Sequence, residues 1–100
     1  MIHILVNDDR IIIAGHAGAA PHGQSVPCEA VTSLVNCIAA SLDEITGQGE
    51  NVQSMKSGEF ILNMKDLSAE SGLLVRSFLL GLQLVTEAYP EYITIISCCF

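Results

Sequence analysis

Residues 25–42 read SVPCEAVTSLVNCIAASL, a stretch with the pattern of an amphipathic α-helix. Ser25 is a residue type that caps helix N-termini, and Pro27 suits a first turn because its missing N–H is not needed there. The acidic residues 43–44 and the segment Thr46–Gly49 mark the predicted end of the helix. The apolar residues recur at helical spacing and predict one buried stripe, made of Val31, Leu34, Val35, Ile38 and Leu42.

On both sides of this helix, turn residues separate pairs of short runs rich in β-branched and other apolar residues. Asn7-Asp8-Asp9 lies within the first pair and Ser57-Gly58 within the second, which predicts two β-hairpins. The last arm of the second hairpin is the more apolar, and we expect it to be the more buried. The predicted strands are Met1–Val6 with Arg10–Ala14, and Asn51–Lys56 with Glu59–Lys65.

A second helix is predicted to open at Ser68, with Glu70 in its first turn, and to stop at Tyr89-Pro90. A final strand, Tyr92–Cys98, follows it. The apolar band of this helix is too wide for contact with one sheet alone, so the helix either lies between two layers or carries a subunit contact. The band comprises Leu74, Phe78, Leu82 and Val85 on one face, with Leu73, Leu80 and Leu84 beside them.

These elements follow the order ββαββαβ. The order predicts an α+β fold, a two-layer sandwich in which two helices pack on one mixed or antiparallel sheet. One hundred residues allow one domain, which we expect to span residues 1–100. Because 50% of the residues are hydrophobic and only 15% are charged, we also expect a partner to cover part of the apolar surface in an oligomer.

Composition excludes several classes of protein. Four basic and eleven acidic side chains give a formal net charge of −7, and four scattered positive charges cannot neutralise a nucleic-acid backbone. A membrane-spanning helix needs about 20 consecutive apolar residues, and no run approaches that length. The first residues read as a strand and not as a secretory signal, so we expect a cytoplasmic protein with reduced cysteines.

The most informative stretch for chemistry joins the first hairpin to the first helix. His16 stands where a strand gives way to a glycine-rich loop, and Cys28 stands at the start of the helix. A helix N-terminus favours thiolate, the reactive form of cysteine, and an imidazole within reach can take the thiol proton. The sequence therefore suggests a cysteine nucleophile with a histidine base. The competing interpretation is a cysteine packed in the core and a histidine bonded to the loop backbone.

Other sites are less well supported. His22 is a rival to His16, but it follows Pro21 in the middle of the loop, where we expect it to be solvated. The histidines and cysteines lack the paired spacing typical of zinc sites, and the glycines match no complete nucleotide-binding motif, so we expect neither a metal nor a cofactor. Cys37 is predicted to lie in the core, and Cys98 and Cys99 have no evident function.

The chain resembles the ribosomal-processing cysteine proteases of the Prp family. The resemblance covers the whole chain and agrees with the ββαββαβ order. The spacing of the GHAG motif from the cysteine, joined to the Tyr-Pro ending, is fairly specific. The residues that carry the resemblance are Gly15-His16-Ala17-Gly18, Gly23, Cys28 (twelve residues after the histidine), Ser33, Gly81-Leu82 and Glu87-Ala-Tyr89-Pro90.

This resemblance implies a homodimeric endopeptidase that removes the N-terminal extension of a large-subunit ribosomal protein. In that mapping Cys28 is the nucleophile and His16 is the general base and acid. We expect backbone N–H groups at the helix start and in the glycine loop to stabilise the oxyanion. The acidic chain suits a basic peptide. The residues that we expect to bind substrate are Gly15, Ala17, Gly18, Gly23 and Ser25.

Three residues depart from the family's pattern. Ser25 stands where an aspartate is common, Pro27 removes a backbone donor, and Glu29 replaces a small residue beside the cysteine. These departures leave a second interpretation open: a catalytically weakened or inactive homologue that binds a ribosomal protein without cutting it.

Overall fold

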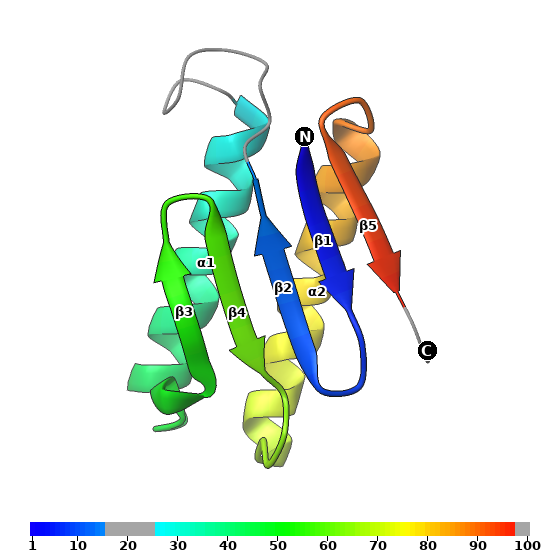
Figure 1. The fold of residues 1–100 in the computed structure, drawn as a ribbon. Helices are drawn as coiled ribbons and strands as arrows, with labels where there is room; N and C mark the ends of the chain where they lie inside the picture. The colour runs from blue at the N-terminus through cyan, green and yellow to red at the C-terminus, as the bar shows by residue number, and fades with distance from the viewer. Residues whose placement is uncertain (16–25, 98–100) are drawn as a thin grey trace.

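A computed structural model describes residues 1–15 and 26–97 of the chain. The order ββαββαβ is confirmed over these residues, with a short 3₁₀ turn (η1) before the second hairpin (Figure 1). The elements are β1 (Ile2–Val6), β2 (Arg10–Ala14), α1 (Val26–Glu44), η1 (Gly49–Asn51), β3 (Val52–Lys56), β4 (Glu59–Asn63), α2 (Ala69–Ala88) and β5 (Ile93–Ser97).

Among the described residues, five strands form one mixed sheet in the order β3-β4-β2-β1-β5. Both hairpins are antiparallel, as predicted, and β2 pairs antiparallel with β4. The pairing of β1 with β5 is parallel. Figure 1 shows that α1 and α2 both cover the same face of this sheet, so the predicted two-layer α+β sandwich is confirmed.

The core lies between the helices and the covered face of the sheet. Alternate residues along each inner strand point into it: β1 buries Ile2, Ile4 and Val6, and β4 buries Phe60 and Leu62. The more apolar arm of the second hairpin is thus the more buried one, as predicted. The helices contribute two stripes at helical spacing: Val31, Val35, Ile38 and Leu42 from α1, and Val75, Phe78 and Leu82 from α2.

The ends of the second hairpin differ from the prediction by one or two residues. Asn51 belongs to η1, and its side-chain amide donates to the carbonyls of Asn63 (2.9 Å) and Lys65 (3.0 Å). The side chain of Asn63 in turn accepts from the backbone N–H of Lys65 at 3.0 Å. These side-chain bonds form a turn in place of further strand pairing, which explains why β4 ends at Asn63.

The start of α2 is as predicted, because the Ser68 hydroxyl accepts from the backbone N–H of Ser71 at 3.1 Å. The wide apolar band of α2 is buried on one side and exposed on the other. Phe78 and Leu82 are buried, whereas Leu73, Leu80 and Leu84 are 64%, 58% and 58% exposed. Within the described part of the chain, α2 does not lie between two layers, so that alternative is wrong. The subunit contact stays a prediction.

Cys37 is exposed, so its predicted place in the core is wrong. The prediction followed its spacing of three residues from Leu34, but Leu34 is only half-buried at the edge of the stripe. At about 100° per residue, Cys37 lies ~130° around α1 from the centre of the residues that are buried.

Candidate active site

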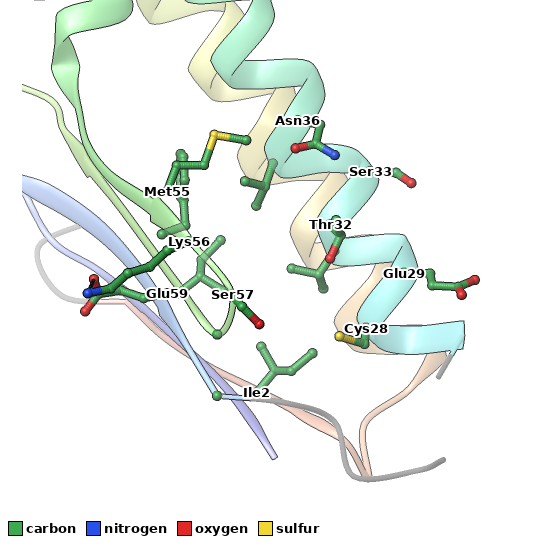
Figure 2. Close-up of a pocket in the computed structure, with 16 residues that line it drawn as sticks. Ile2, Cys28, Glu29, Thr32, Ser33, Asn36, Met55, Lys56, Ser57 and Glu59 are labelled. Carbon is green, nitrogen blue, oxygen red and sulfur yellow. Dashed lines mark ion pairs between the residues drawn. The ribbon is translucent and has the colours of Figure 1, made fainter. Parts of the chain in front are cut away.

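A groove of about 620 Å³ separates the first half of α1 from the β3–β4 hairpin (Figure 2). One wall is α1 and the other is the hairpin with its turn. The floor is the covered face of the sheet, where Ile13 of β2 is paired with Phe60 of β4. The lining residues are Ile2, Ile13, Gly15, Cys28, Glu29, Val31, Thr32, Ser33, Val35, Asn36, Met55, Lys56, Ser57, Gly58, Glu59 and Phe60.

Cys28 lies in the first turn of α1, at one end of this groove, and is half-buried. Its sulfur points from the helix towards the side of the groove where Ser57 forms the hairpin turn (Figure 2). The N–H groups of a first helical turn carry partial positive charge, which favours an anion there. A thiol in this position has access to the groove and an electrostatic environment suited to a nucleophile.

Gly15 lines the same end of the groove and holds the end of β2 in place. Its φ of +96° is in the left-handed region, and its N–H donates to the carbonyl of Gly58 at 2.9 Å. A Cβ atom at this position would lie 2.5 Å from the carbonyl oxygen of Met1. Glycine is therefore required at position 15, both by the positive φ and by the lack of space for a Cβ atom. The hydrogen bond to Gly58 joins the end of β2 to the turn of the β3–β4 hairpin.

The other predicted site residues lie outside the described residues: His16, Ala17, Gly18, Gly23 and Ser25, together with the rival His22. Their roles stay predictions. Cys98 and Cys99 also lie outside the described residues. Over residues 1–15 and 26–97, no group of three or more histidine, cysteine, aspartate or glutamate side chains is placed to hold a metal ion. No helix in those ranges is long and apolar enough to cross a membrane.

Two of the departures from the family's pattern are within the described residues. Pro27 is buried in the first turn of α1, where an N–H has no intrahelical acceptor, so the helix forms around it without loss. The side chain of Glu29 is exposed at the rim and points away from the sulfur of Cys28 (Figure 2). Neither residue closes the groove.

Several lining residues were missed by the sequence analysis. Thr32 and Asn36 follow Cys28 at intervals of four, which places all three on one side of α1 facing the groove (Figure 2). That periodicity was available in the sequence. The hairpin residues Met55 and Ser57 carry no comparable signal, because their place across the groove from α1 depends on how the hairpin packs.

Glu59 is the acidic residue of the hairpin wall. The Ser54 hydroxyl donates to its carboxylate at 2.6 Å, and the ammonium of Lys56 lies 3.4 Å away. The hydrogen bond from Ser54, assisted by the charge of Lys56, lowers the pKa of Glu59. Because the folded pKa is lowered, these contacts stabilise the folded hairpin only while Glu59 is ionised, and their contribution disappears as the pH falls through that pKa.

Comparison with known protein structures shows the same fold in other chains. A crystal structure of an essential ribosomal processing protease Prp from S. aureus, in complex with a covalently linked product peptide, has a TM-score of 0.77 and 21% identity over 97% of both chains. The complex of S. aureus Prp with a substrate peptide has a TM-score of 0.72 and 21% identity, again over 97% of both chains. The structure of a protein from Streptococcus mutans has a TM-score of 0.68 and 20% identity, over 97% of this chain and 93% of the other.

Comparison with curated proteins gives no significant match. The sequence profile described as cysteine protease Prp matches residues 1–94. That match covers both hairpins, both helices and Cys28, and it confirms the resemblance stated from the sequence. The chain therefore belongs to the Prp family of cysteine proteases.

Proposed function

We propose that this protease removes the N-terminal extension of a large-subunit ribosomal protein, with Cys28 as nucleophile and His16 as general base and acid. The observation that carries the proposal is the position of Cys28, in the first turn of α1 and open to a groove of about 620 Å³. The S. aureus relatives of the same fold are a ribosomal processing protease in complex with substrate and product peptides.

The proposed reaction is acyl transfer through a thioester. His16 takes the proton of the Cys28 thiol, and the thiolate sulfur forms a bond to the scissile carbonyl carbon. The C–N bond then breaks as His16 passes the proton to the leaving amine. A water molecule, deprotonated by His16, hydrolyses the thioester and regenerates the thiol.

Backbone amides are the proposed donors to the oxyanion. The N–H groups of the first turn of α1 point out of the helix at the end where Cys28 lies, and a developing negative charge there is stabilised by their dipoles. We assign substrate binding to Gly15, Ala17, Gly18, Gly23 and Ser25. Gly15 supports this assignment by lining the groove.

The chain's charge supports a basic substrate. A formal net charge of −7 attracts a positively charged extension, which accelerates encounter and makes kcat/KM fall as salt is raised.

We place the reaction in the cytoplasm, where ribosomal proteins are made. We propose that residues 1–100 form one catalytic domain that uses no cofactor and makes no direct nucleic-acid contact.

His16→Ala is expected to lower kcat by about 10²–10⁴-fold, because general base catalysis is lost while the groove is unchanged. The substrate is a synthetic peptide that spans the junction between the extension and the mature ribosomal protein, and the products are measured by mass spectrometry. His22→Ala is the matched control and is expected to retain most of the activity.

If His22→Ala abolishes cleavage and His16→Ala does not, the base is His22. Tight binding of the peptide by the native chain without any cleavage would contradict the endopeptidase proposal. That result would favour a binding module with altered residues at Ser25, Pro27 and Glu29.

We further propose that the protease is a homodimer that joins through the outer face of α2. Leu73, Leu80 and Leu84 follow one another on that face and are each more than half exposed. Sedimentation at micromolar concentration is expected to give a mass twice that of the chain, and Leu80→Glu is expected to give the monomer. A native chain that sediments as a monomer would contradict this proposal.

A further inference from the structure

We propose that Asn36 binds the backbone of the substrate two helical turns from Cys28 and thereby sets a minimum length for the peptide on one side of the scissile bond. This inference rests on the proposed endopeptidase function. It adds a residue that determines which peptides are accepted, through their length and not through their side chains.

The spacing between Cys28 and Asn36 along α1 gives the minimum length of the peptide. Asn36 is eight residues beyond Cys28, which corresponds to ~12 Å along a helix that rises 1.5 Å per residue. Both residues line the same groove, so the groove extends over that distance. An extended peptide advances about 3.3 Å per residue, so about three to four residues span the interval from the scissile bond to Asn36.

The side chain of Asn36 is not used by the fold. Asn7, Asn51 and Asn63 each hydrogen-bond to backbone through their side chains. Within residues 1–15 and 26–97, by contrast, the exposed amide of Asn36 makes no hydrogen bond. Since α1 does not depend on this amide, its place beside the groove is available to a ligand.

The surroundings of Asn36 suit a peptide backbone. A primary amide has both donors and an acceptor, so it can pair with the C=O and N–H groups of one residue in an extended chain. Met55 lies across the groove on β3 (Figure 2) and is 47% exposed. The buried Val35 and Phe60 also line the groove. The peptide would thus meet hydrogen-bonding groups on the helix side and apolar surface on the other sides.

The test compares native protein with Asn36→Ala on two nested series of synthetic peptides, each shortened by one residue at a time from one end. In one series, native kcat/KM is expected to fall by about 3- to 10-fold when the residue that reaches Asn36 is removed, as for loss of a hydrogen bond. Asn36→Ala is expected to show that loss already on the longest peptide and no further loss on truncation. The change is expected in KM with kcat preserved.

Cys37→Ala is the matched control, since Cys37 is exposed next to Asn36 on α1 and does not line the groove. It is expected to retain the native dependence on length. If Asn36→Ala responds to truncation by the same factor as native protein, the inference is wrong.

A binding measurement separates this inference from the proposed function. In the Cys28→Ala background, the affinity of fluorescent long and short peptides is measured with and without Asn36→Ala. If native protein cleaves nothing but Asn36→Ala still weakens only the long peptides, the endopeptidase proposal fails and Asn36 remains a ligand-binding residue. If Asn36→Ala leaves all affinities unchanged, Asn36 has no such role.

Discussion

Cys28→Ala is expected to abolish cleavage of the junction peptide, with kcat lowered by about 10⁴-fold or more. Loss of the nucleophile removes the covalent route entirely, and only binding and the oxyanion donors remain. Affinity for the peptide is expected to stay close to native, because the walls and floor of the groove are unchanged. Cleavage is measured by mass spectrometry of the products and affinity by fluorescence anisotropy.

Cys37→Ala is the control for this change as well. Both cysteines lie on α1, but Cys37 is exposed outside the groove, and its sulfur lies 3.9 Å from the hydroxyl oxygen of Ser41. It is expected to cleave at the native rate. Residual turnover by Cys28→Ala above one-tenth of native would contradict the role of Cys28, provided that circular dichroism shows both variants folded.

Gly15→Ala is expected to destabilise the protein by about 3 kcal/mol. Part of this cost is the left-handed conformation of residue 15, at about 1–2 kcal/mol for a residue with a Cβ atom. The rest is the contact with the Met1 carbonyl oxygen, 2.5 Å from the added Cβ, since the chain must shift to relieve it. Urea denaturation followed by circular dichroism measures the free energy of unfolding.

Gly47→Ala separates the two contributions. Gly47 also has a positive φ, +68°, but a Cβ atom there would meet nothing within 4 Å. It is expected to lose only the conformational part, about 1–2 kcal/mol. Equal losses for the two variants would mean that the packing of Gly15 against the N-terminal strand contributes nothing.

Local patterns carried most of the fold prediction. The period of α1, the turn residues Ser57-Gly58 and the cap at Ser68 each act over a few residues, and the structure has the corresponding elements where they were predicted. The pairing of β2 with β4 joins segments about 50 residues apart, and the parallel pairing of β1 with β5 joins segments about 90 residues apart. No local pattern encodes either pairing.

The site was predictable to a smaller extent. The position of Cys28 at a helix start follows from the local sequence, and α1 begins two residues before it. The groove requires the hairpin to pack beside α1, so Met55 and Ser57 could not be inferred from their neighbours in sequence. The error at Cys37 has a related cause: spacing from a single leucine does not locate the centre of a buried stripe, which only the packed sheet defines.

The most direct test of the central claim, that Cys28 is the nucleophile, is to trap the acyl-enzyme. The protein is mixed with the junction peptide, quenched in acid after a few milliseconds to seconds, and analysed by intact and fragment mass spectrometry. The expected result is an added mass equal to the N-terminal product minus water, attached to the sulfur of Cys28. Rapid turnover with that mass on another residue would contradict the account.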